Sequence, residues 1–225
     1  MGYIISYFYI PNMEIVILSV GVLISAVLAV IYSQRDNVKW YSVFKPLTTI
    51  LIISIASIVY LKFNSFYSAI IIVSLIFSLI GDVFLIHKKY FLHGLSSFLL
   101  AHIGFTIGFA SIYGFNWTFT PLVFLTLIGA SYFIYLRKDL DKYAIPVAIY
   151  ISVIVIMNWQ AIGLVYINNT IVFFGMAIAS LLFSFSDSIL AYSKFKKPFC
   201  GAEILTLSTY WISIYILAIA GLYLE

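Results

Sequence analysis

Charged side chains are scarce in this sequence. They make up 9% of its 225 residues, whereas globular domains average about 25%. Hydrophobic residues make up 64%, and the mean hydropathy is +1.13. This balance excludes a soluble globular domain and predicts a chain that lies almost entirely in a membrane. The single cysteine, Cys200, excludes an internal disulfide and does not indicate a redox compartment.

Long apolar runs joined by short connections account for nearly the whole chain. A membrane-spanning helix needs about 20 mostly apolar residues. Eight runs meet this requirement, at residues 13–33, 44–61, 66–86, 91–113, 119–136, 143–163, 170–192 and 202–223. In the second run, Pro46 is expected in the first helical turn, where a missing N–H is tolerated. We therefore predict an all-α, polytopic bundle of eight transmembrane helices, forming a single integral membrane domain over residues 1–225.

Basic residues lie almost entirely on one side of this predicted topology. Of the 12 lysines and arginines, only Lys62 falls on the other side. Cytoplasmic connections of membrane proteins carry such an excess, so the four basic connections are predicted to be cytoplasmic and both termini outside. The net charge of +4 then reflects topology and attraction to anionic lipid, and not nucleic-acid binding. The expected location is that of a multi-pass integral membrane protein, in the cell membrane if the source is bacterial.

Two aspartates interrupt the apolar runs near their predicted cytoplasmic ends. Asp82 lies about one turn from the end of the third run, and Asp187 occupies the same place in the seventh. A carboxylate inside a span costs about 2.5–3.5 kcal/mol on insertion scales, so such a residue is usually functional. The matching positions suggest two parallel repeats, at 13–113 and 119–223, which would bring both acids to one central cavity.

Two carboxylates, one protonated and one ionised, can act together as a general acid and a general base. Glycoside hydrolases use this chemistry on acetals. A vinyl ether is a related target, because protonation of its β-carbon gives an oxocarbenium ion that water captures. Three alternatives are buried acids that only fix helix packing, a zinc site shared with His93 and His102, and proton-coupled transport of a lipid or small molecule. The GxSxG motif of serine hydrolases does not occur in the sequence.

Short motifs around these residues resemble the YhhN family of membrane proteins. They are KPLTT from Lys45, GDVFL from Gly81, FLHGLSSFLLAH from Phe91, SDSILA from Ser186 and STYW from Ser208. The resemblance implies eight spans and hydrolysis of the vinyl-ether bond of lysoplasmalogens to a fatty aldehyde and a glycerophospho-base. It implies a lysophospholipid substrate among the surrounding membrane lipids, and neither a cofactor nor a metal.

The resemblance also implies roles for individual residues. Asp82 and Asp187 match the two intramembrane acids of the family and would be the catalytic pair. His102 would support the site or a proton path, Lys45 would hold the phosphate or orient an acid, and Tyr210 matches the tyrosine of the last span. The remaining candidates for substrate binding or support lie on the same spans: Glu203, Ser184 and His93.

Overall fold

The computed structural model describes residues 12–224, and within them the chain forms eight α-helices that are long and apolar enough to cross a membrane. They are α1 (Met13–Gln34), α2 (Val38–Phe63), α3 (Phe66–Leu85), α4 (Phe91–Tyr113), α5 (Phe119–Leu136), α6 (Ala144–Ile167), α7 (Ile171–Phe195) and α8 (Ala202–Ala220). The predicted all-helical fold with eight spans is confirmed. The protein is a multi-pass integral membrane protein.

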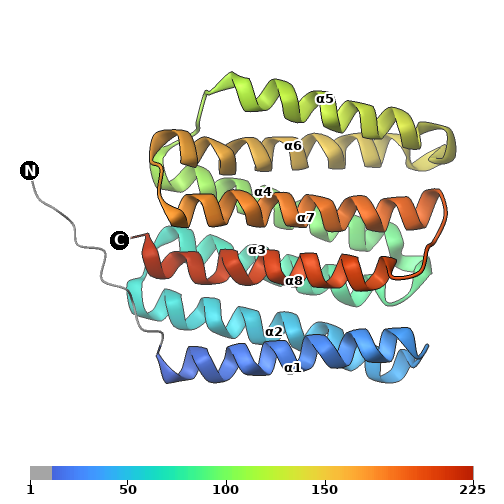
Figure 1. Cartoon of the computed structure of the whole chain (residues 1–225), viewed down its shortest axis with the longest axis horizontal. Helices are drawn as coiled ribbons and strands as arrows, with labels where there is room; N and C mark the ends of the chain where they lie inside the picture. Colours follow the sequence, from blue (N-terminus) through green and yellow to red (C-terminus); the bar gives the residue numbers. More distant parts are fainter. Residues whose placement is uncertain (1–11, 225) are drawn as a thin grey trace, which may run out of the picture.

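The helices run antiparallel to their neighbours in sequence and form one elongated bundle (Figure 1). The connections α1–α2, α3–α4, α5–α6 and α7–α8 lie together at one end, and they carry nearly all the lysines and arginines. We call this the basic end. The start of α1 and the end of α8 lie at the opposite end (Figure 1). That the basic end faces the cytoplasm stays a prediction from the charge distribution.

The first four helices and the last four occupy matching places across the bundle. Helices α1 and α5 lie at the two edges, α2 and α6 lie inside them, and the other four fill the middle (Figure 1). Helix α8 packs against α2, and α4 packs against α6. Each of the first four helices thus has a counterpart four places later in the chain. This arrangement supports the proposal of two parallel repeats at 13–113 and 119–223.

The start of α2 differs from the prediction. The helix begins at Val38, six residues before the predicted run, because the Asn37 side chain accepts a hydrogen bond from the Trp40 backbone N–H (3.3 Å) and caps it. The prediction that Pro46 lies in the first helical turn was therefore wrong: Pro46 lies inside α2. A proline there leaves the carbonyl of Ser42, four residues earlier, without its helical donor.

Large side chains fill the half of the bundle that lies away from the basic end. The fully buried residues in this half include Ile52, Ile55, Ile71, Leu75, Phe105, Phe109 and Met176. On their helices they are all farther from the basic end than Asp82, His102 or Asp187. These side chains close-pack the part of the bundle that lies beyond the two aspartates along α2, α3 and α4.

Glycine allows α3 and α4 to approach each other closely. A Cβ atom added at Gly104 would lie 2.2 Å from the Ser74 Oγ and 3.2 Å from the Ser74 Cβ. We expect Gly104→Ala to destabilise the protein by about 1–3 kcal/mol, because the buried Ser74 cannot yield without moving α3. Thermal unfolding in detergent measures this loss. Gly175→Ala is the matched control, since its Cβ would meet Ile216 at an ordinary 3.7 Å. Equal thermal unfolding midpoints for Gly104→Ala and Gly175→Ala would contradict the prediction.

Candidate active site

Asp82 lies near the basic end of α3 and is 1% exposed. Its Oδ2 accepts hydrogen bonds from the Thr49 hydroxyl (2.6 Å) and the Tyr210 hydroxyl (2.9 Å). Its Oδ1 accepts no hydrogen bond within the described part of the chain, and lies 4.0 Å from the Lys45 ammonium. Asp82 is therefore surrounded by one cation and two hydroxyl donors, which stabilise an ionised carboxylate.

The residues around Asp82 come from local sequence patterns. Lys45 and Thr49 are one helical turn apart on α2 and so present their side chains to the same side. Gly81, which precedes Asp82, has no side chain because the ring of Phe98 from α4 takes that space: a Cβ there would lie 2.6 Å from the ring. The GD pair thus combines an acid with a close approach of α4 to α3.

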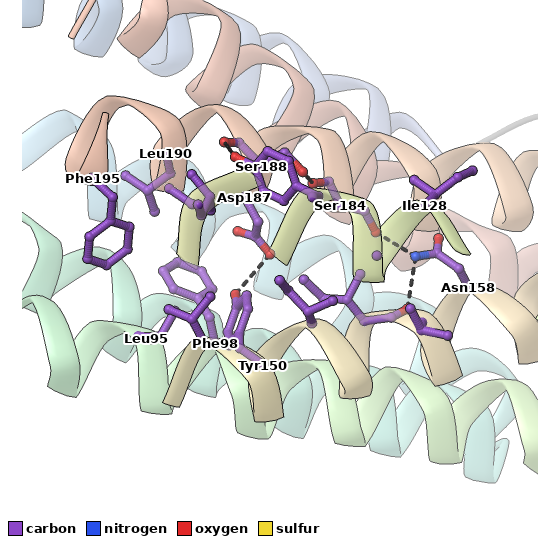
Figure 2. Close-up of a pocket in the computed structure, with 18 of the residues that line it drawn as sticks. Leu95, Phe98, Ile128, Tyr150, Asn158, Ser184, Asp187, Ser188, Leu190 and Phe195 are labelled. Carbon is purple, nitrogen blue, oxygen red and sulfur yellow. Dashed lines mark hydrogen bonds between the residues drawn. The ribbon is translucent and has the colours of Figure 1, made fainter. Parts of the chain in front are cut away.

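Asp187 occupies the corresponding place on α7 and is 8% exposed. Its Oδ2 accepts a hydrogen bond from the Tyr150 hydroxyl of α6 (2.8 Å; Figure 2). The same oxygen lies 3.3 Å from Nε2 of His102, which is fully buried on α4. The other nitrogen of that ring, Nδ1, lies 2.6 Å from the carbonyl oxygen of Phe98.

The two ring nitrogens of His102 face different partners. A carbonyl oxygen can only accept a hydrogen bond, so Nδ1 is the nitrogen that donates to Phe98. Nε2 faces the carboxyl of Asp187 at 3.3 Å and makes no hydrogen bond within the described residues. A proton held between Nε2 and Asp187 would satisfy both groups.

The two carboxylates are held in the same way. Asp82 of α3 takes one donor from α2 and one from α8. Asp187 of α7 takes one contact from α6 and one from α4. In both cases one partner comes from the second helix of the same proposed repeat, and the other from the last helix of the other repeat. Phe183 packs between these environments, 4.4 Å from His102 and 5.2 Å from Tyr210 between ring centroids.

Both aspartates line one cavity of about 500 Å³ near the basic end, which we call the polar cavity. Lys45, Glu203 and Tyr210 line it as well. Nearer the basic connections its lining includes His87, Lys88, Lys194, Pro198 and Phe199. The polar cavity thus combines three carboxyls with three ammonium groups. A volume of this size is typical of a small-molecule site.

A second, apolar cavity of about 260 Å³ lies between α4, α5, α6 and α7 (Figure 2). Apolar side chains make up most of its lining, and Asp187 supplies the only carboxyl group among its lining residues. The two cavities have five lining residues in common: Leu85, Phe91, Phe98, Asp187 and Leu190. Asp187 therefore lies where a polar space and an apolar space meet.

The structure brings most of the predicted site residues together and leaves two apart. Glu203 lies in the polar cavity, where its carboxylate accepts a hydrogen bond from Tyr41. Ser184 lines the apolar cavity instead and bonds to Asn158 (2.6 Å). His93 is exposed at the start of α4, packs against Phe84 and lines neither cavity. Over residues 12–224, no three His, Cys, Asp or Glu side chains gather closely enough to hold a metal ion.

Sequence reasoning did not assign two of the partners of the aspartates, Thr49 and Tyr150. Thr49 lies on α2 and Tyr150 lies on α6. A signal was present for each of them. Thr49 follows Lys45 by one helical turn and so lies on the same face of α2. Each hydroxyl also lies about one turn after a proline: Thr49 after Pro46, and Tyr150 after Pro146. A hydroxyl at this place in both proposed repeats indicates a shared function.

The YhhN family model matches residues 40–221 of the chain. The chain belongs to the YhhN family. A relative described as the membrane protein YhhN of Escherichia coli is 28% identical over 208 residues, which cover 91% of this chain and 98% of the relative. No solved structure matches the chain.

Other relatives have names that include an activity. Lysoplasmalogenase TMEM86A of Homo sapiens is 31% identical over 158 residues, which cover 67% of this YhhN-family chain and 64% of the relative. A protein of Dictyostelium discoideum named lysoplasmalogenase homolog is 37% identical over 107 residues, which cover 42% of this chain and 34% of the relative. The match thus spans about a third of the Dictyostelium protein and somewhat less than two thirds of the human one.

Proposed function

We propose that this YhhN-family protein is an integral membrane lysoplasmalogenase. It would cleave the vinyl-ether bond of a single-chain alkenyl phospholipid and release a fatty aldehyde and a glycerophospho-base. The observation that carries the proposal is the pair of buried carboxyls, Asp82 and Asp187, on one cavity near the basic end. Similarity to the human and Dictyostelium lysoplasmalogenase relatives supports the substrate class.

The environments of the two carboxyls favour different roles. Asp187, which lies 3.3 Å from Nε2 of His102, would share a proton with that ring and act as the general acid. Asp82, beside Lys45 and two hydroxyl donors, is held ionised and would be the general base, with its free Oδ1 as the accepting atom. Two carboxyls in one site thus divide the acid and base roles because their neighbours differ, as in glycosidases.

The proposed reaction has three steps. The proton of the Asp187–His102 pair moves to the β-carbon of the vinyl ether, and the α-carbon becomes part of an oxocarbenium ion. Water attacks the α-carbon and gives a proton to Asp82. The resulting hemiacetal collapses: its hydroxyl proton goes to Asp187, its bond to the glycerol oxygen breaks, and that oxygen takes the proton from Asp82. The products are an aldehyde and an alcohol, and both carboxyls return to their starting states.

The remaining residues of the polar cavity suit a phosphate headgroup. Lys88 and Lys194 line the part nearest the basic connections, where a headgroup at the membrane surface would lie. Ammonium groups bind phosphate oxygens as point charges. In the proposed mechanism Lys45 neutralises Asp82, and His93 takes part in no step. Glu203, which accepts a hydrogen bond from Tyr41, lies beside the space proposed for the headgroup.

A proton-coupled transporter, the alternative raised by the two acids, is not favoured. Alternating access needs a path from the acids to both ends of the bundle. Here the polar cavity lies near the basic end, and large buried side chains such as Phe105 and Phe109 fill the other half. The curated relatives with a named activity are lysoplasmalogenases.

The test uses purified full-length protein and three lysolipids with the same headgroup, carrying an alkenyl, an alkyl-ether or an acyl chain. We expect aldehyde release from the alkenyl lipid alone. In heavy water the aldehyde, trapped by reduction as it forms, should carry one deuterium at the carbon next to the former carbonyl, because the general acid protonates the β-carbon. Release of fatty acid from the acyl lipid, or aldehyde without deuterium, would rule out the proposed reaction.

A further inference from the structure

The apolar cavity has an end that the proposed reaction does not use. Between Asp187 and Asn158 it is lined by Leu125, Ile128, Ile154, Val155, Leu181 and Ser184 (Figure 2). We call this part the chain slot. The residues of α7 that line the whole cavity run from Leu181 to Phe195, which is about 20 Å at the α-helical rise. The cavity is therefore elongated along the helix axes.

The chain slot is open at the side of the bundle. Ile128 of α5 is 67% exposed and Leu181 of α7 is 44% exposed, although both line the slot. In a membrane protein this exposure is to lipid tails, because both residues lie within spanning helices. The gap between α5 and α7 therefore connects the slot with the hydrocarbon core of the bilayer.

Helix α5 is held at both ends, and between them it packs on α6, where a Cβ added at Gly129 would lie 3.0 Å from Ile151 and Val155. Near the basic end, the Tyr132 hydroxyl donates a hydrogen bond to the Ser188 carbonyl of α7 (2.5 Å), and Lys196 pairs with Asp139 after α5. At the opposite end, the Trp159 ring N–H donates to the Thr118 carbonyl (2.7 Å). No α5 residue between Pro121 and Leu136 is buried. The middle of α5 thus forms one wall of the slot and has no enclosed side chain of its own.

We propose that the chain slot binds the single hydrocarbon chain of the lysolipid, which enters sideways from the bilayer between α5 and α7. The headgroup then lies in the polar cavity near Lys88 and Lys194, and the chain passes Phe98 and Leu190 into the slot. This rests on the proposed function, and it explains why Asp187 lies at the junction: the vinyl ether joins headgroup and chain. An elongated apolar slot beside a polar cavity whose outer part carries Lys88 and Lys194 matches a lipid with one chain and a phosphate head.

The test separates chain binding from catalysis. A lysophosphocholine with a saturated alkyl-ether chain that carries a diazirine is photocrosslinked to the full-length protein in lipid nanodiscs, and labelled peptides are mapped by mass spectrometry. We expect saturable labelling of the slot residues of α5, α6 and α7, which unlabelled alkyl lysophosphocholine prevents. Ile128→Trp and Leu181→Trp, from opposite walls, should each reduce saturable labelling by about tenfold or more, because the larger indole ring would occupy space that the hydrocarbon chain needs.

The matched control is Leu127→Trp. Leu127 is 60% exposed on the same helix but lines neither cavity, so its replacement should leave labelling and aldehyde release unchanged. Labelling spread evenly over the lipid-facing helices, or full aldehyde release by both slot variants, would overturn the slot and leave the proposed function intact. Slot labelling in a protein that releases no aldehyde would overturn the proposed function and support the slot as a chain-binding site.

Discussion

Aldehyde release is expected to fall by a factor on the order of 10²–10⁴ in Asp187→Asn, the range typical of a lost general acid or base. Asparagine keeps the shape of the side chain but cannot hold the proton that the proposed mechanism places between Asp187 and His102. The first step would then lack its acid. The comparison is made as kcat with the alkenyl lysolipid, on protein whose elution and thermal unfolding match those of the wild type.

Asp→Asn substitutions at two other positions separate the loss of a catalytic group from a general effect of removing a negative charge. Asp82→Asn should also lower kcat strongly, because the water would lose its base. Asp36→Asn is the control: Asp36 is exposed in the α1–α2 connection at φ +52°, a conformation that asparagine tolerates. Wild-type kcat in Asp187→Asn would remove that residue from the mechanism, and wild-type kcat in Asp82→Asn would do so for Asp82.

Lys45→Met is expected to destabilise the protein by about 3 kcal/mol or more, since it leaves the buried charge of Asp82 without its cation. Lys45 is 5% exposed, and its ammonium also lies 5.5 Å from the centre of the Tyr41 ring. Thermal and denaturant unfolding in detergent would measure the loss.

A double variant tests the cause. Adding Asp82→Asn to Lys45→Met removes the unpaired charge, so the double variant should be more stable than Lys45→Met alone. Lys39→Met, which changes an exposed lysine in the first turn of α2, should have little effect. If Lys45→Met unfolds at the wild-type midpoint, or if the second substitution adds a further loss, then Lys45 does not neutralise Asp82.

The helices could be predicted because each one is a long apolar run, and a bilayer accepts little else. The failure at α2 has a physical reason. Residues 38–43 include Lys39 and Ser42, so the predicted apolar run begins only at residue 44. The helix itself extends past this apolar run to Val38, where the Asn37 side chain caps it. Helix starts depend on capping contacts, which hydropathy does not report.

The candidate site was partly predictable for the same reason. Asp82 and Asp187 are conspicuous because an acid in a hydrocarbon run is costly. The two histidines of α4 could not be told apart, since which face of α4 meets α7 depends on packing: His102 meets Asp187, and His93 faces outward. Ser184 lies one turn from Asp187 along α7, yet it bonds to Asn158 in the apolar cavity.

The sequence by itself determined that this is a membrane protein of eight helices, because hydrophobic length and the scarcity of charge are properties of the chain alone. It also identified the two acids, because their cost in lipid does not depend on their neighbours. Only the tertiary structure decided which hydroxyl, imidazole or ammonium each acid meets, and that Asp187 joins a polar cavity to an apolar one. Those contacts arise between helices far apart in sequence, and helix packing sets them.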